Sequence, residues 1–275
     1  MSSAQEQWIE SHPYLRNVAD FQQVVREVFE KLAPQPVSMP DWKMIFDRYG
    51  EGVPLLESLS AGIEYSSAAG ELLLAGSTDL LKRTLTEAVT ASAKLLREYL
   101  HVSEENRTAA ITWVQNGDPE GAPPPSAGLL RLLAWAAIRR TLAPVLQSYA
   151  ELRKDDDWML GYCPVCGALP PLAQVLPEGG LPRMLACCCC HSTWQFRRIG
   201  CPFCGNDDQN QLSILTIEQE PLFRLDTCRE CNGYLKTYLG NSDLDLHLSD
   251  WSSVHLDVLA RQHDLERKGA SLFEI

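Results

Sequence analysis

All ten cysteines of this 275-residue chain lie between Cys163 and Cys231. Two residues between two cysteines allow a tight turn to direct both sulfurs at one ion, and two such turns supply four thiolates about 2.3 Å from a metal. The spacing therefore indicates two closed, four-thiolate metal sites rather than unliganded core cysteines. Eight of the ten form four Cys-x-x-Cys pairs: Cys163/Cys166, Cys187/Cys190, Cys201/Cys204 and Cys228/Cys231.

An internal repeat indicates which pairs share an ion. Cys163 recurs as Cys201 and Cys187 recurs as Cys228, after 38 and 41 residues, as expected for a duplicated small ribbon. Joining consecutive pairs keeps each site inside one repeat, whereas interleaving them would break it. We therefore predict one site from Cys163, Cys166, Cys187 and Cys190, and a second site from Cys201, Cys204, Cys228 and Cys231.

The predicted metals have a structural role, because four protein ligands leave no open position for a substrate water. Zinc and mononuclear iron of the rubredoxin type share this tetrahedral thiolate geometry, so the sequence leaves both metals open. The chain contains no Ser/His/Asp nucleophile elbow, phosphate-binding glycine loop, HExxH motif or recognisable acid/base carboxylate pair. We therefore predict that the protein is not an enzyme.

Two further cysteines, Cys188 and Cys189, are surplus to the ligand count. Either they occupy the turn between two ligands and point away from the metal, or they take part in ligand exchange or thiol redox chemistry. His191 directly follows a complete ligand set, so we expect it not to replace a thiolate. We expect Trp194 to pack over a ribbon.

The elements around the cysteines are predicted to be short strands. A hairpin turn is expected at Pro177-Glu178-Gly179-Gly180, between two strands. The same order of strands and turns repeats after Cys201. The strand candidates are residues 172–176, 181–186, 193–196, 212–217, 222–226 and 234–239.

The first 150 residues instead carry helical periodicity and no cysteine. Loops are expected at residues 116–119 and 123–125. The predicted helices are 18–32, with Val18, Phe21, Val25, Val28 and Leu32 as its apolar stripe; 79–100, with Leu81, Leu85, Leu95 and Tyr99 on its apolar side; 104–115, capped by Ser103; and 129–152, kinked or interrupted at Pro144.

A closing helix is predicted from Ser249 or Asp250 onward. Its expected apolar face consists of Trp251, Val254, Val258 and Leu265, and three histidines are read as surface or packing residues: His247, His255 and His263. The fold class is therefore α+β, with an all-helical domain at 1–157, two tandem rubredoxin-like or zinc-ribbon modules at 158–199 and 200–246, and a C-terminal helix at 247–275.

Composition and charge narrow the range of expected partners and locations. The net charge is −12, without the basic excess that binding to phosphates needs, so nucleic acid is not an expected partner. We read no secretory signal and no apolar run long enough for membrane insertion. Because an unexported chain keeps its thiols reduced, metal is favoured over disulfides and a cytoplasmic location is expected.

The arrangement resembles the formate dehydrogenase accessory (formation) protein family, FdhE. The resemblance is strong over residues 158–260 and weaker before them. It rests on the Cys-Pro-x-Cys-Gly pairs, Arg183 and Leu185 before Cys187, Thr193-Trp194 after Cys190, Tyr234-Leu235-Lys236 after Cys231, the closing segment from Ser249 to Leu259, and Asp20-Phe21-Gln22.

This resemblance implies a cytoplasmic, non-catalytic maturation factor with rubredoxin-like iron-binding folds. It implies that the eight paired cysteines are metal ligands and that the ribbons contact the catalytic subunit of a respiratory formate dehydrogenase before its export. The chain departs from the family at Cys188, Cys189 and His255. Two alternatives stay open: a zinc-ribbon adaptor for another protein or nucleic acid, and a small thiol or iron redox protein. The oligomeric state, including a homodimer, also stays open.

Overall fold

The computed structural model describes residues 3–60, 65–116, 123–154, 157–176 and 183–273. The chain forms two compact units. The first, helical unit contains Trp8–Asp41 and Leu59–Arg153, and the second unit contains Ser2–Gln7, Trp42–Ser58 and Lys154–Ile275. The second unit therefore holds all ten cysteines, together with residues 42–58 from the N-terminal half.

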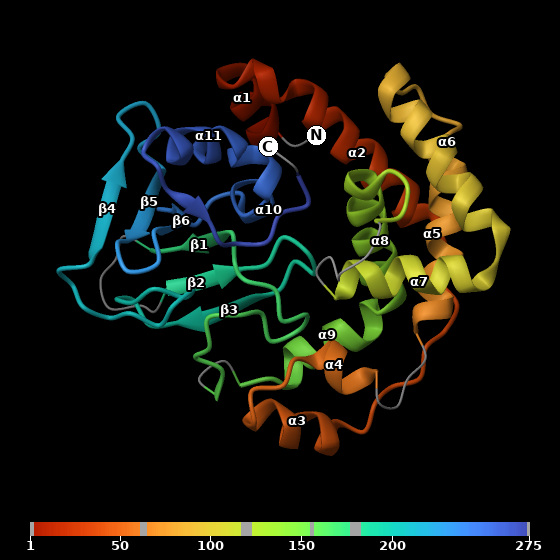
Figure 1. Cartoon of the computed structure of the whole chain (residues 1–275), viewed down its shortest axis with the longest axis horizontal. Coiled ribbons are helices and arrows are strands. Elements are labelled where there is room, and N and C mark those ends of the chain that lie inside the picture. Colours follow the sequence, from red (N-terminus) through yellow and green to blue (C-terminus); the bar gives the residue numbers. More distant parts are fainter. Residues whose placement is uncertain (1–2, 61–64, 117–122, 155–156, 177–182, 274–275) are drawn as a thin grey trace. The chain divides into compact units, whose positions relative to one another are not determined.

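The helices of the N-terminal half are α1 (Ser3–Ser11), α2 (Arg16–Lys31), α3 (Trp42–Gly50), α4 (Leu55–Leu59), α5 (Ser66–Leu80), α6 (Glu87–Val102), α7 (Glu104–Gln115), α8 (Ala127–Thr141) and α9 (Ala143–Leu152). Within the helical unit, α5 packs against α2, α6, α7 and α8 (Figure 1). Leu73 on α5 and Leu133 on α8 are fully buried. At Gly76 a Cβ atom would lie 2.4 Å from the ring of Phe29, so glycine permits the close approach of α5 to α2.

Most of the predicted helices are confirmed. The helix predicted at 18–32 is α2, although its buried residues include Ala19 and Phe29 rather than Val18 and Phe21. Ser103 caps α7, since its Oγ accepts a hydrogen bond from the Asn106 N–H at 3.2 Å. The long helix predicted at 129–152 is interrupted as expected, because Pro144 opens α9 after α8 has ended.

The single helix predicted at 79–100 is wrong. The helix α5 ends at Leu80, a turn follows, and α6 starts at Glu87. The Thr86 side chain causes the restart, because its Oγ1 accepts the N–H of Val89 at 3.4 Å and caps the new helix. The predicted apolar side is also wrong: Leu95 is exposed, whereas Ala93, Leu96 and Leu100 are buried.

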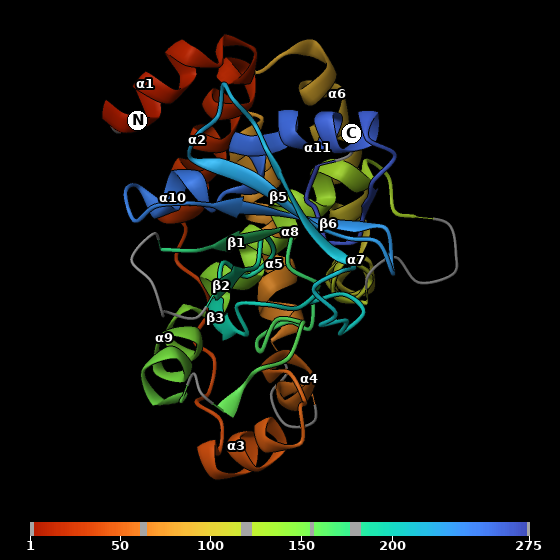
Figure 2. The same ribbon diagram turned by 90° about the vertical axis from the view of Figure 1, so that its left-hand side faces the viewer.

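One sheet carries the cysteine-rich half. Its strands are β1 (Leu172–Gln174), β2 (Arg183–Ala186), β3 (Thr193–Phe196), β4 (Leu212–Thr216), β5 (Phe223–Cys228), β6 (Gly233–Tyr238) and β7 (Glu266–Arg267). The order is β3-β2-β1-β6-β5-β4, and β7 pairs with β6. Figure 2 shows β3, β2, β1, β6 and β5 following one another in this order. All six predicted strands are present in the described residues. The predicted turn at 177–180, residues 181–182 and the predicted loop at 117–119 lie outside them.

Each repeat contributes an antiparallel three-stranded ribbon, β1-β2-β3 and β4-β5-β6. The two ribbons join through a parallel pairing of β1 with β6, in which Leu172 lies opposite Lys236 and Gln174 lies opposite Tyr238. The repeat predicts two modules, and the structure adds that they share one continuous sheet. The α+β fold class is confirmed.

The closing segment comprises α10 (Leu244–His247), a 3-10 turn (Asp250–Ser253) and α11 (Val254–Gln262). Figure 1 shows α10 and α11 beside β5 and β6. The predicted apolar face is partly wrong, since Trp251 is buried but Val258 is exposed. Asp257 is buried instead, for a reason given below. Among the described helices, none has both the length and the apolar character needed to cross a bilayer.

Candidate metal centres

The first group of four cysteines lies in two turns, one before β1 and one between β2 and β3. The Sγ atoms of Cys163 and Cys190 are 3.4 Å apart, and those of Cys166 and Cys187 are also 3.4 Å apart. All four sulfurs lie within 4.8 Å of one another. Three of the four residues are buried and Cys166 is half-buried.

The second group repeats this arrangement, with two cysteines in the turn before β4 and two in the turn between β5 and β6. The Sγ separation is 3.7 Å for Cys201 and Cys231 and 3.7 Å for Cys204 and Cys228. This group is closer to solvent, because Cys204 is exposed and Cys231 is half-buried. The structure thus brings the eight cysteines together in the two groups that the repeat predicts.

The spacing of the sulfurs fits a bound ion. Four thiolates at about 2.3 Å from a central metal have tetrahedral edges of about 3.8 Å, close to the separations of 3.4 and 3.7 Å. A disulfide would require about 2.05 Å, and all ten cysteines are free thiols. The donor set fits zinc or mononuclear iron equally well.

The segment that follows α3 supports the first group. The backbone N–H groups of Leu55 and Leu56, at the start of α4, donate to the carbonyls of Pro164 and Val165 at 2.9 and 2.8 Å. These are N–H groups that a helix leaves unpaired within itself. Residues 42–58 therefore belong with the ribbons because they hold the Cys163–Cys166 turn in place.

The residue after each Cys-x-x-Cys pair has a left-handed backbone conformation. The φ angles are +76° at Gly167, +61° at His191, +76° at Gly205 and +57° at Asn232. This conformation favours glycine and tolerates asparagine. His191 is exposed, lies outside the four-sulfur group and occupies the same turn position as Gly167.

Replacement of Gly205 by alanine tests this backbone requirement. Among the described residues, an added Cβ would have only an Arg197 side-chain nitrogen near it, at 4.0 Å, so any loss reports the backbone and not a clash. We expect Gly205→Ala to reduce the free energy of unfolding by about 1 to 2 kcal/mol, measured by urea titration of the zinc-loaded protein. Gly205→Asn is the matched control and should lose less, whereas equal stability of both variants and the parent would contradict the account.

The environment of the thiols shifts the pKa values of cysteines in both groups. Burial raises the pKa of Cys163 and of Cys201. Hydrogen bonds from its neighbours, Cys163 first, lower the pKa of Cys187. Burial opposes ionisation of Cys228, but N–H donors at Cys231 and Glu230 and the Asn206 side chain outweigh it and lower its pKa to about 7. Because thiolates are the metal-binding form of cysteine, binding of a cation to either group would release protons.

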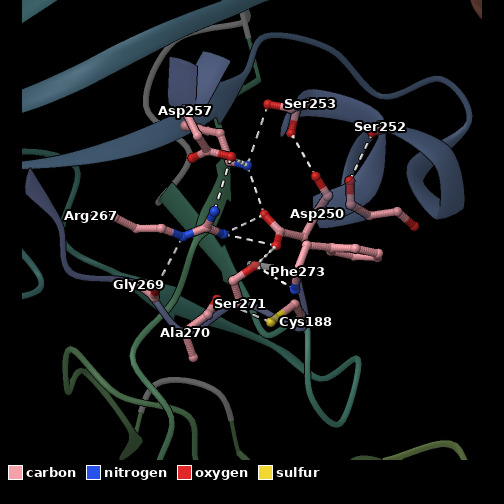
Figure 3. Close-up of polar contacts among 12 residues, drawn as sticks. Cys188, Asp250, Ser252, Ser253, Asp257, Arg267, Gly269, Ala270, Ser271 and Phe273 are labelled. Carbon is pink, nitrogen blue, oxygen red and sulfur yellow. Dashed lines mark hydrogen bonds and ion pairs between the residues drawn. The ribbon is translucent and has the colours of Figure 1, made fainter. Parts of the chain in front are cut away.

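The surplus thiols Cys188 and Cys189 are both buried, 5% and 6% exposed. The Cys188 Sγ donates to the carbonyl of Ala270 at 3.1 Å, in the C-terminal segment (Figure 3). Neither belongs to a four-sulfur group. Trp194 packs in the core as expected, fully buried, with its Nε1 donating to the carbonyl of Leu160.

A buried charge cluster beside the sheet was not predicted from the sequence. The Lys236 Nζ on β6 lies 2.7 Å from Asp250 Oδ1 and 2.8 Å from Asp257 Oδ2, and all three side chains are almost fully buried. Arg267 on β7 donates to both oxygens of Asp250 at 2.8 Å and lies 3.1 Å from Asp257 (Figure 3). Two positive and two negative charges therefore balance. The cluster explains why the inner face of the closing segment is polar.

Further hydrogen bonds complete this cluster. The Tyr234 hydroxyl donates to Asp257 Oδ1 at 2.7 Å, and the Ser271 hydroxyl donates to Asp250 Oδ2 at 2.6 Å. Burial by itself would raise the pKa of Asp250, but Lys236 and Arg267 together lower it. The sequence did hold a signal, because Asp250 and Asp257 are seven residues apart and such a spacing places side chains on one helix face.

Comparisons with known proteins agree with this picture. No protein-family model matches the chain. Proteins named "Protein FdhE homolog" are similar to it: that of Aquifex aeolicus (strain VF5) is 32% identical over 129 residues, or 44% of this chain and 45% of that protein. That of Shewanella baltica (strain OS185) is 28% identical over 185 residues, or 65% of this chain and 59% of that protein. The matched part spans about half the length of these relatives.

A solved structure extends the similarity to the fold of nearly the whole chain. It is described as the crystal structure of the FdhE protein from Pseudomonas aeruginosa, and it superposes with a TM-score of 0.67 over 97% of this chain and 91% of that chain. The sequence identity is 22%, so this match concerns the fold. Together the comparisons confirm the resemblance to FdhE that the cysteine pairs indicated.

Proposed function

We propose that this chain is an FdhE-type accessory factor for formate dehydrogenase, acting in the cytoplasm without catalytic activity of its own. The single observation that carries the proposal is the pair of four-sulfur groups in repeated ribbons, found on a fold shared with an FdhE protein. The similarity of the cysteine-rich part to FdhE homologues supports it further.

In this proposal each four-sulfur group holds one metal ion, iron or zinc. Cys163, Cys166, Cys187 and Cys190 hold the first ion, and the repeat-related Cys201, Cys204, Cys228 and Cys231 hold the second. A bound ion would offset part of the negative charge of the four thiolates and fix the turns at the ends of the ribbons. The role of the protein residues is to present a rigid ribbon surface to a partner, the catalytic subunit of formate dehydrogenase.

The exposed strand β4 supports a contact surface on the second ribbon. It is the last strand of the described sheet, paired with β5, and Ile214 at its centre is 56% exposed. We expect Ile214→Asp to reduce co-purification of the tagged catalytic subunit at least several-fold. Val102→Asp on α6 is the matched control, because Val102 is 75% exposed and lies in the helical unit. Equal recovery with both variants would remove β4 from the proposed surface.

Genetic complementation tests the function as a whole. A deletion strain should lose formate dehydrogenase activity in a formate-dependent dye-reduction assay, and the parent gene should restore it. Cys201→Ser should fail to restore activity, whereas Cys188→Ser, at a buried thiol outside both groups, should succeed. Full activity in the deletion strain would refute the proposed function.

A further inference from the structure

The C-terminal segment, residues 264–273, starts beside the second four-sulfur group. Its strand β7 pairs with β6 directly after Cys231. The Glu266 N–H donates to the carbonyl of Asn232 at 2.8 Å, and the Asn232 side-chain nitrogen donates to the carbonyl of Asp264 at 2.6 Å. The start of the segment is therefore fixed to the turn that supplies the last two sulfurs of the second group.

The same segment then connects the two turns of the first group. The Ala270 N–H donates at 2.9 Å to the carbonyl of Leu169, which follows the Cys163–Cys166 turn. The Ala270 carbonyl accepts a hydrogen bond at 3.1 Å from the Sγ of Cys188, which lies inside the Cys187–Cys190 turn (Figure 3). The backbone of one residue therefore ties together two turns that each supply two sulfurs.

The residue before Ala270 permits this close approach. At Gly269 a Cβ atom would lie 2.5 Å from the carbonyl oxygen of Pro170 and 2.5 Å from the Cα of Pro171, both of which are backbone atoms. The φ angle of Gly269 is not left-handed, so the conformation itself would accept alanine. Any larger residue at this position must therefore move the segment away from the first group.

The second group has a different bridge between its turns. The Asn206 side-chain nitrogen, two residues after Cys204, donates to the Sγ of Cys228 in the other turn at 3.6 Å. By the internal repeat, the equivalent residue of the first group is Ala168, two residues after Cys166. Alanine has no side-chain donor. The backbone of the C-terminal segment therefore makes the connection in the first group that an asparagine side chain makes in the second.

We propose that the C-terminal segment is a clamp that holds the two turns of the first metal group together and joins this group to the second. The proposal rests on the proposed binding of metal. One end of the clamp is fixed at Asn232 and the other at Ala270. Between them, Arg267 donates to both carboxylate oxygens of the buried Asp250 (Figure 3), so the clamp is also anchored in its middle.

Zinc release from the full-length protein tests the clamp with all eight ligand cysteines in place. A chelator removes zinc, and pulses of N-ethylmaleimide alkylate each thiol as it becomes free. Peptide mass spectrometry then assigns an initial release rate to each group. Loss of a group that supports metal ligands lowers affinity about tenfold or more. We therefore expect Gly269→Ala to release the first group about tenfold faster than the parent, with the second group unchanged.

Gly50→Ala is the matched control for the added methyl group. Among the described residues, a Cβ at Gly50 would meet open space, so both groups should keep the parental release rate. A second pair of variants tests the clamp without a steric clash. Cys188→Ala removes the thiol donor to Ala270 and should speed release of the first group, by less than Gly269→Ala does. Cys188→Ser keeps a donor and should match the parent.

Asn206→Ala supplies the opposite case, because it removes the connection in the second group and should speed release of that group alone. Equal release of the first group from the parent, Gly269→Ala and Cys188→Ala would overturn the clamp. Equal acceleration of both groups in Gly269→Ala would also overturn it, because that result reports a general loss of stability. Parent cysteines that are alkylated at the same rate with and without zinc would instead overturn the proposed metal binding.

Discussion

Removal of the metal ions is expected to unfold the ribbons while the helical unit stays folded. Structural zinc contributes about 10 to 16 kcal/mol of apparent binding energy, whereas whole domains are stable by about 5 to 15 kcal/mol. The strands of the ribbons are short, from three to six residues, and the turns that join them enclose the four-sulfur groups. If the groups bind metal as proposed, we expect the metal to make the largest single contribution to the stability of this part.

Hydrogen exchange with mass spectrometry measures this expectation directly. After treatment with a chelator and a thiol reductant, peptides from 183–240 should lose protection, and peptides from α5 and α8 should keep it. Because β1 pairs with β6, both ribbons should lose protection together. Addition of zinc should restore it. Unchanged protection in a protein shown to be free of metal would contradict the account, and loss of protection in α5 and α8 would show that the units do not fold separately.

Loss of the Lys236 charge is expected to be the most damaging single substitution outside the cysteines. Lys236→Ala leaves the buried carboxylates of Asp250 and Asp257 with one cation, Arg267, between them. Removal of one partner from a buried ion pair costs about 3 to 5 kcal/mol. We expect a loss of this size in urea unfolding of the zinc-loaded protein.

Two controls test whether the stability loss comes from the unbalanced buried charges. Lys43→Ala removes an ion pair with Asp47 whose side chains are 84% and 64% exposed, and exposed pairs contribute at most about 1 kcal/mol. The double variant Lys236→Met with Asp257→Asn restores charge balance around Asp250 and Arg267, and it should be more stable than Lys236→Met alone. A loss for Lys236→Ala no larger than for Lys43→Ala would show that the cluster contributes little.

The cluster also gives the protein a defined response to acid. Because the pKa of Asp250 is lower in the folded than in the unfolded chain, its ionisation stabilises the fold at any pH above the unfolded-state pKa. That contribution is lost as the pH falls through the folded-state pKa. The Asp250→Asn variant should lack this part of the acid sensitivity.

The sequence predicts the cysteine groups and the strands well because both depend on local spacing. Two intervening residues are enough to form a Cys-x-x-Cys turn. The internal repeat then indicates which two turns form one four-sulfur group. The sequence does not reveal the break between α5 and α6, because Leu81 and Leu85 continue the apolar pattern through the turn that separates the helices, and Thr86 caps only the start of α6.

Other features depend on contacts between distant residues. The pairing of β1 with β6 joins segments about 60 residues apart, and no local pattern encodes it. The sequence does not indicate that Lys236 and its aspartate partners are buried, because lysine and aspartate are ordinarily surface residues. Their burial follows from a charge balance that requires Arg267 as well.

Metal content is the measurement that tests the central claim most directly. The protein is purified without oxygen, and its metals are counted by elemental analysis and by native mass spectrometry, with an absorption spectrum to separate iron from zinc. The account predicts two ions per chain, falling to one or none in Cys204→Ser. A folded protein that contains no metal and takes up neither zinc nor iron would contradict it.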